Sequence, residues 1–286
     1  MCKTLSPVNM IFFDPFTTPN LFIGVSTASS FYQNDTLRRL VSFPLSTSYK
    51  PIKLGSFYMR YLMPKENAEL YIEMGRADKF ATPLNLIKDS IPMGYTAGVR
   101  KWTRLFKSNT YFYFGIEITR LQLPDPRLIF TQGAPFGLPQ SNSWYLGDQV
   151  AQGYTNNGQV MGAWIGPGSN SQTLQLGVVN GSKKIMLTGE RVLHNEDFYY
   201  YNYITNDLRT SYQNPNKHWA DISATAQIQW NVRNLLLSAA WSYTSLLNYR
   251  WTKLDGGFSG PSKLSDRKNT QVYVSAAWYF NKNILK

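Results

Sequence analysis

Polar and apolar side chains alternate without a break along two long stretches of the chain. TYFYFGIEITR, at Thr110–Arg120, places Phe112, Phe114, Ile116 and Ile118 on one face and Tyr111, Tyr113, Gly115, Glu117 and Thr119 on the other. ADISATAQIQW, at Ala220–Trp230, has the same two-residue period, which is that of a β-strand. Both runs span 11 residues. That length exceeds the usual ~5–6 residues of a strand in a soluble protein and matches the ~9–11 residues with which a tilted strand crosses a bilayer.

The same pattern predicts nine further strands, and turn residues separate most neighbours. The predicted strands are Leu21–Tyr32, Leu54–Leu62, Ala68–Gly75, Tyr95–Phe106, Gly158–Ile165, Thr173–Val179, Ile185–Leu193, Leu235–Thr244 and Gln271–Phe280, and a further strand could lie within Asp35–Leu45. Short helical pieces are plausible at Phe80–Asp89 and Asn195–Asp207. Short turns such as Asn180-Gly181-Ser182 alternate with long loops such as Leu121–Asn157, as in outer-membrane barrels. We therefore predict an all-β, antiparallel transmembrane barrel of about 11–12 strands, with a soluble β-sandwich as the competing fold.

The composition agrees with strands that have one oily and one wet face. Charged residues make up 16% of the 286 residues and aromatic residues 15%, and the mean hydropathy is −0.31. Charge is thus well below the ~25% of soluble domains, and no apolar run approaches the ~18 residues of a spanning helix. Aromatic residues near strand ends, such as Trp230 and Trp278, fit an interfacial girdle.

Neither a linker nor a low-complexity segment interrupts residues 1–286, so we predict one domain. The start lacks a signal-peptide pattern, and we expect the chain to begin inside a longer barrel protein, without its N-terminal strands.

The net charge of +12 favours a polyanionic partner. The basic residues are scattered in short pairs such as Arg38-Arg39, and no segment matches a nucleic-acid-binding module. We therefore expect acidic polysaccharide, lipopolysaccharide and outer-membrane lipid as partners, and no nucleic acid.

Catalytic and metal-binding patterns are weak. Cys2 is the only cysteine and the histidines are His194 and His218, which gives neither a disulfide framework nor a cysteine-based zinc site. Glu69 and Glu73 could mimic a glycosidase pair, but residues four apart on a strand are separated by roughly 13 Å. We expect instead that Arg60 and Arg100 bridge these carboxylates in a polar lumen. The prediction is a protein that is not an enzyme and holds no cofactor or metal.

Two loops combine aromatic rings with amides and hydroxyls. Leu121–Asn157 contains Trp144 and Tyr145, and Asn195–Lys217 contains six aromatic residues. Sugars stack their C–H faces on such rings and hydrogen-bond through their hydroxyls. These loops could therefore contact a glycan, or they could equally be an aromatic belt or a lumen plug.

Three segments together resemble the Wzi-type capsule assembly proteins, particularly their Bacteroidetes forms. They are GRADKFATPLNLIKDS from Gly75, AGVRKWT from Ala97 and GYTNNGQVMGAWIGPGSNS from Gly153. A Glu190-Arg191 strand end followed by His194 also fits. The resemblance covers Leu54 to Leu193 best. One departure is that Asn156 or Asn157 stands where the family typically has a histidine.

The resemblance implies an outer-membrane, lectin-like barrel that binds capsular polysaccharide and helps to assemble or anchor the capsule. Family members form an eighteen-stranded barrel, so the resemblance implies that this chain is the C-terminal part of such a protein or a shortened member. The candidate polysaccharide-binding or lumen-lining residues are Glu73, Arg76, Asp78, Arg100, Glu117, Tyr154, Asn156, Gln159 and Glu190. An outer-membrane porin or substrate channel, or a barrel enzyme that uses His194 or His218, are the alternatives.

Overall fold

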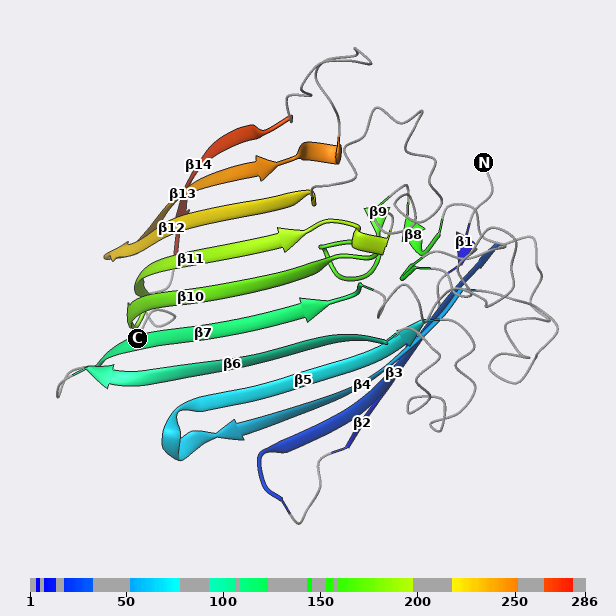
Figure 1. Ribbon diagram of the computed structural model, residues 1–286. Coiled ribbons are helices and arrows are strands. Elements are labelled where there is room, and N and C mark those ends of the chain that lie inside the picture. The colour runs from blue at the N-terminus through cyan, green and yellow to red at the C-terminus, as the bar shows by residue number, and fades with distance from the viewer. Residues whose placement is uncertain are drawn as a thin grey trace, which may run out of the picture.

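The described part of the chain forms one large curved sheet of antiparallel strands and a separate two-stranded hairpin (Figure 1). The computed structural model describes residues 4–5, 8–13, 18–32, 52–77, 93–105, 109–122, 143–145, 153–156, 159–197, 218–251 and 265–279. The long strands are β3 (Leu21–Tyr32), β4 (Ile52–Met63), β5 (Ala68–Ala77), β6 (Met93–Leu105), β7 (Thr110–Arg120), β10 (Asn170–Asn180), β11 (Lys183–Leu193), β12 (Ala220–Val232), β13 (Leu235–Leu247) and β14 (Arg267–Trp278). The short elements are β1 (Thr4–Leu5), β2 (Val8–Phe13), β8 (Thr155–Asn156), β9 (Gln159–Val160) and the 3₁₀ turns η1 (Pro64–Glu66) and η4 (Tyr249–Trp251).

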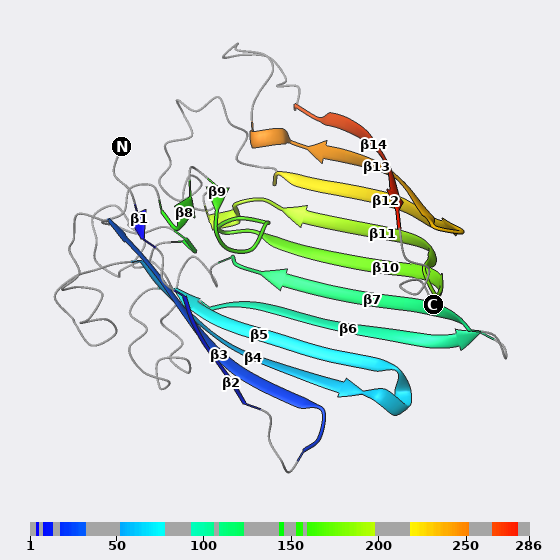
Figure 2. The same cartoon turned by 180° about the vertical axis from the view of Figure 1, so that it is seen from behind.

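Each long strand pairs with its neighbours in chain order, from β3 to β14, and β1 and β2 both pair with β3. Among the described strands no pairing joins β14 back to β1 or β2. Seen from both sides, the sheet is a curved wall with β2 and β14 at its two ends (Figures 1 and 2).

Ten of the eleven strands predicted from alternation are confirmed. Leu21–Tyr32 and Thr110–Arg120 have the predicted bounds, and the other eight differ by a few residues at their ends. The predicted strand at Gly158–Ile165 is wrong, because only Gln159–Val160 is extended and it pairs with β8 outside the main sheet. The possible strand at Asp35–Leu45 and the helical piece at Phe80–Asp89 lie outside the described residues, as does most of Asn195–Asp207.

Short turns and long connections lie at opposite ends of the sheet, as predicted. Two-residue turns join β10 to β11 and β12 to β13, with Gly181 and Arg233 at positive φ, and η1 joins β4 to β5. At the other end, the connections between β3 and β4, β5 and β6, β7 and β10, β11 and β12, and β13 and β14 are all much longer. We call these the short-turn end and the long-loop end.

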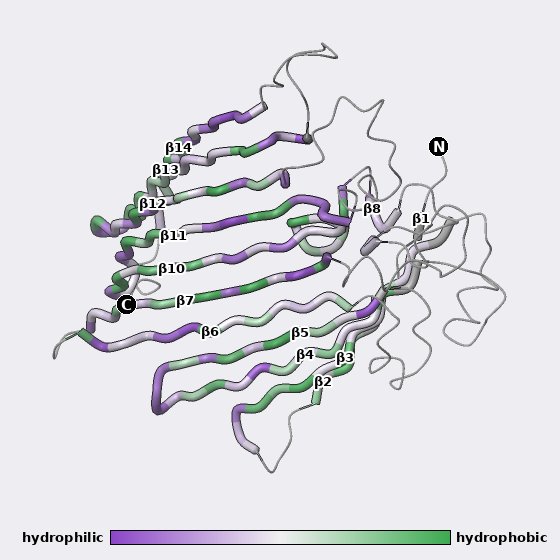
Figure 3. Tube along the Cα trace, viewed as in Figure 1, coloured by the Kyte–Doolittle hydropathy of each residue, from purple (hydrophilic) through white to green (hydrophobic). Residues whose placement is uncertain are grey.

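Hydrophilic and hydrophobic residues both occur along the long strands (Figure 3), and because successive side chains of a strand point to opposite faces, the two faces of the sheet differ in polarity. One face, the apolar face, carries large hydrophobic side chains that are 36–79% exposed, among them Leu70, Phe112, Ile116, Ile118, Leu174, Val178, Ile185, Leu187, Ile222, Ile228, Trp230, Leu237, Trp241, Val272, Val274 and Trp278. The opposite face, the polar face, carries Ser56, Glu69, Glu73, Arg100, Glu117, Thr173 and Gln175. A water-soluble protein rarely exposes so continuous an apolar surface, whereas a lipid-facing barrel wall requires one. Among the described residues there is no helix long and apolar enough to cross a membrane.

Candidate functional site

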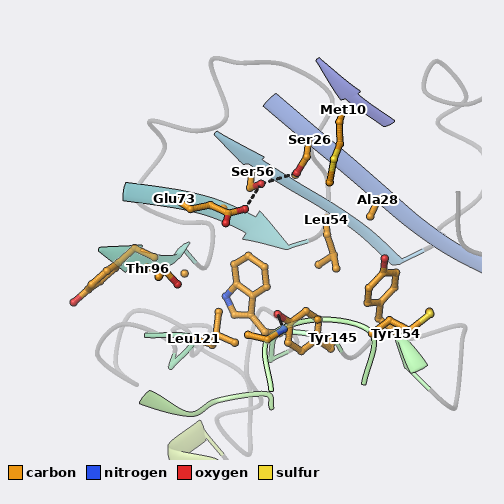
Figure 4. A pocket seen from close by; sticks show the side chains of 18 residues that line it. Met10, Ser26, Ala28, Leu54, Ser56, Glu73, Thr96, Leu121, Tyr145 and Tyr154 are labelled. Atoms are coloured by element: carbon orange, nitrogen blue, oxygen red, sulfur yellow. Dashed lines mark hydrogen bonds between the residues drawn. The ribbon is translucent and has the colours of Figure 1, made fainter. Parts of the chain in front are cut away.

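A cavity of about 450 Å³ lies at the long-loop end of the polar face, over β3 to β6. Its floor is formed by strands, and its other side is formed by residues 121, 144–145, 154 and 161–163 from the long β7–β10 connection. Figure 4 shows Ser26, Ser56 and Glu73 on the strands, with Tyr145 and Tyr154 across the cavity from them. The site therefore has a half carried by the sheet and a half carried by one loop.

Register brings the polar groups of the sheet together. Ser26 on β3 lies opposite Ser56 on β4, and the two hydroxyl oxygens are 2.7 Å apart. Ser56 donates to Glu73 Oε1 on β5 at 2.6 Å. The result is a row of hydroxyl, hydroxyl and carboxylate across three strands, which holds the Glu73 side chain in place.

The aromatic half packs against a glycine floor. Gly75 and Gly94 are paired across β5 and β6, and a Cβ on either would come within 3.0 Å of the Trp144 ring. Trp144, Tyr145 and Tyr154 are 5–6% exposed. They form a ladder of rings, because Trp144 meets Tyr145 edge-on at 5.8 Å and Tyr145 stacks on Tyr154 at 6.1 Å.

Backbone and hydroxyl contacts fix this ladder. Tyr154 N–H donates to the Tyr145 carbonyl at 2.7 Å, and Ala163 N–H donates to the Tyr145 hydroxyl oxygen at 2.9 Å. Burial raises the pKa of both phenols, partly offset at Tyr145 by the Ala163 hydrogen bond and reinforced there by Glu73. Both tyrosines are therefore neutral at physiological pH, so each ring keeps a phenolic O–H.

A charged network continues down the polar face toward the short-turn end. Arg60 Nε donates to Glu69 Oε1 at 2.7 Å, and Arg100 lies 4.0 Å from Glu69 and 3.9 Å from Glu117. Tyr71 donates to Glu117, its phenolic end lies next to Gly98, and the Arg100 guanidinium lies over its ring. The prediction that Arg60 and Arg100 bridge the glutamates of β5 is confirmed for Glu69.

The structure separates the residues that the sequence grouped as candidates. Glu73 and Tyr154 line the cavity, while Arg100 and Glu117 belong to the network below it. Glu190 also faces the polar side, where Thr173 donates to it at 3.1 Å, but on β11 away from the cavity.

Three further candidates lie elsewhere. Arg76 is 3% exposed and follows Gly75 on β5, so its side chain projects from the face of the sheet opposite to the one that carries Glu73. Asn156 and Gln159 pair with each other in the β8–β9 hairpin and are exposed. Asp78 lies outside the described residues.

Sequence reasoning did not identify Ser26, Ser56, Gly75 or Gly94 as site residues, because each becomes one only through strand register. Trp144 and Tyr145 carried a signal, since they are the aromatic pair of a Gly-, Ser- and Asn-rich loop. Their place in the cavity agrees with the interpretation of that loop as one that packs against the lumen.

Both histidines are paired with carboxylates at the long-loop end of β11 and β12. His194 Nε2 lies 2.8 Å from Asp221 Oδ2, and its ring stacks on Trp219 at 4.2 Å. His218 Nδ1 lies 2.7 Å from Glu196 Oε2. In the described part of the chain, no three His, Cys, Asp or Glu residues are grouped as metal ligands.

No family model matches the sequence, and no curated protein matches it. Among solved structures, the chain is similar to Wzi from Escherichia coli, described as an outer membrane protein involved in group 1 capsule assembly and a carbohydrate-binding β-barrel. The TM-score is 0.62 at 11% sequence identity, over 96% of this chain and 52% of that one. The chain thus spans about half the length of the structure it matches. At this identity the likeness concerns the fold: the chain is an all-β, antiparallel sheet of the kind that forms the wall of that barrel.

Proposed function

We propose that this protein is part of an outer-membrane β-barrel that binds a cell-surface polysaccharide, as a component of capsule assembly or anchoring. The observation that carries the proposal is the cavity at the long-loop end. It combines three aromatic rings with a carboxylate and serine hydroxyls on a rigid sheet. Sugar rings need an apolar surface for their C–H faces and polar groups for their hydroxyls.

The surroundings of the cavity support the same proposal. The apolar face would contact outer-membrane lipid and lipopolysaccharide, and the long loops would face the cell exterior, as in barrels of this type. The similarity to Wzi adds a neighbour that is itself described as carbohydrate-binding.

The cavity favours binding over hydrolysis. Glu73 accepts from Ser56, and Glu69 is held between Arg60 and Arg100, so the two carboxylates of β5 are engaged in different networks. A glycosidase needs two carboxyl groups that flank one sugar bond. We propose a binding protein that works without a cofactor.

The test is glycan binding by the purified protein in detergent micelles. Trp144→Ala removes the ring that packs on the glycine floor and should weaken binding of the polysaccharide of the source strain by about tenfold or more. The matched control is Trp278→Ala, which removes an indole from the apolar face near the short-turn end and should leave binding unchanged. Folding of each variant is checked by heat-modifiable mobility in SDS gels.

Two results would refute the proposal. One is a folded wild-type protein that binds none of the surface glycans of its source strain. The other is equal loss of binding in both tryptophan variants. A large ion conductance across planar bilayers without glycan binding would instead favour the porin or channel alternative.

A further inference from the structure

The cavity differs in charge from the chain as a whole. The chain carries a net charge of +12, yet among the described residues that line the cavity Glu73 is the only one with a charged side chain. No lysine, arginine or histidine is among those lining residues. Among the described lining residues, the site therefore carries none of the positive excess that led us to expect an acidic polysaccharide.

Cavities further down the polar face do not reverse this balance. A second cavity, of about 320 Å³, shares Glu73 and Thr96 with the first and adds Arg60, Arg100 and Glu69. A third, of about 70 Å³, shares Tyr71 and Arg100 with the second and adds Glu117. Three glutamates thus face two arginines along the described wall of the three cavities.

The two arginines are already engaged. Arg60 donates to Glu69 at 2.7 Å, and Arg100 lies within 4.0 Å of both Glu69 and Glu117. A sugar carboxylate that entered the wall would have to compete with these glutamates for either guanidinium. It would also approach Glu73 as a like charge, in a partly enclosed site where repulsion is screened less than in water.

The Glu73 carboxylate is suited to accept a hydrogen bond from a ligand. Its Oε1 receives the Ser56 hydroxyl at 2.6 Å, and Ser26 stands behind Ser56. An ionised carboxylate has several acceptor positions and no proton to donate. A sugar hydroxyl or ammonium group that donates to Glu73 would form a charge-assisted hydrogen bond, which is stronger than a neutral one.

We propose that the sugar unit held in this cavity carries no acidic group and donates to Glu73 from a hydroxyl or an amino group, with its ring against Trp144 and Tyr154. The cavity selects a neutral or amino sugar from the polymer. Acidic units, where the polymer has them, stay outside it. The inference rests on the proposed function and names the substrate class of the same site.

The experiment compares sugars that differ only in the acidic group. Oligogalacturonate and its carboxyl-reduced counterpart of the same length are titrated into the wild-type protein, Glu73→Gln and Glu73→Asp in micelles. Glu66→Gln, an identical change in an exposed turn at the short-turn end, is the matched control. The surface polysaccharide of the source strain is titrated in parallel.

We expect the wild-type protein and the Glu66→Gln variant to bind the carboxyl-reduced sugar at least about tenfold more tightly than the acidic one. Glu73→Gln should reduce that ratio by binding the neutral sugar less tightly and tolerating the acidic one. Glu73→Asp keeps the charge and should keep the preference, so the proposal does not depend on one variant folding well.

The possible outcomes distinguish a failure of the inferred sugar class from a failure of polysaccharide binding as such. Tighter binding of the acidic sugar by the wild-type protein, or an unchanged ratio in a folded Glu73→Gln variant, overturns the inference and leaves polysaccharide binding intact. If the wild-type protein binds neither sugar but binds the strain polysaccharide, and carboxyl reduction of that polysaccharide abolishes binding, the inference is likewise wrong. Binding that survives this reduction supports it. Absence of binding to every glycan, including the strain polysaccharide, overturns the proposed function itself.

Discussion

Gly94→Ala tests whether the glycine floor sets the shape of the cavity. A Cβ at this position would lie 2.7 Å from Leu121 Cδ2 and 2.9 Å from Trp144 Cζ2. Real Cβ atoms do not approach other atoms so closely, so the Trp144 ring must move. The adjacent ring atom, Cη2, already lies close to Gly75, where a Cβ would be 3.0 Å from it. We expect the indole to be displaced away from the floor and into the space that a sugar would occupy.

The expected cost follows from overpacking. Adding a methyl group to a tightly packed site usually costs about 1–3 kcal/mol of folding free energy. Replacing glycine also reduces the entropy of the unfolded chain, which offsets about 0.4–1 kcal/mol. We therefore expect a modest loss of stability, on the order of 1 kcal/mol. Glycan affinity should fall by more than this, by about tenfold or more, because the displaced ring both fills the cavity and no longer stacks.

The assay is urea unfolding in micelles together with glycan titration. Gly189→Ala is the control, because it is the same substitution on β11 and a Cβ there would have no atom within 4 Å. This control should leave affinity unchanged, and stability unchanged or higher by about 0.5–1 kcal/mol. If Gly94→Ala behaves like Gly189→Ala in both measurements, the glycine floor does not position Trp144.

Two further predictions concern charged groups outside the cavity. In a double-mutant cycle with Arg60→Gln and Glu69→Gln, we expect a coupling of about 1 kcal/mol in urea unfolding, because Glu69 is 7% exposed whereas the Arg60 side chain is 48% exposed; zero coupling would contradict a working ion pair. Burial, opposed by His218, raises the pKa of Glu196 above 4.5. Its contribution to stability is therefore fully present below pH 4.5 and is lost as the pH rises through the raised pKa. Melting temperatures between pH 4.5 and 7.5 should show this decline in the wild-type protein and a smaller one in Glu196→Gln, and parallel curves would refute it.

Alternation predicted the long strands well because each face of the sheet keeps one polarity along the whole strand. Over β7 and the strands beside it, one face is apolar and the other polar, so the period of two persists to the strand ends. β2 was missed because VNMIFF is a short apolar run followed by Asp14-Pro15, without alternation. It is a strand through its pairing with β3, a tertiary effect.

The segment Gly158–Ile165 shows the opposite error. Its apparent alternation depends on Gly162 and small neighbours, which pack equally well in a bend. A Cβ at Gly162 would lie 2.2 Å from the Tyr145 ring, so this glycine is needed for ring packing. The chain bends here because the loop folds onto its own aromatic ladder, and a local pattern cannot reveal a contact with residues 17 positions earlier.

The candidate site was predictable only in its separate parts. Glu73 stood out as a polar-face carboxylate and Tyr154 as part of a distinctive motif, but Ser26 and Ser56 are unremarkable in sequence. They join Glu73 because hairpin registers align three strands. Neighbouring strands lie about 4.8 Å apart. Ser26 lies directly opposite Ser56, whereas Glu73 reaches Ser56 diagonally, because the register partner of Ser56 is Gly75.

The division of the site between sheet and loop suggests how its specificity can change. Ser26, Ser56 and Glu73 are fixed by strand pairing, and moving any of them would require a shift of a whole strand. Trp144 and Tyr145 belong to a connection that can change in length without altering that pairing. Variation in the loop would therefore change which ring faces are recognised, while the carboxylate would keep its preference for donors. Loop exchange between related barrels should alter sugar identity but not the discrimination against acidic units.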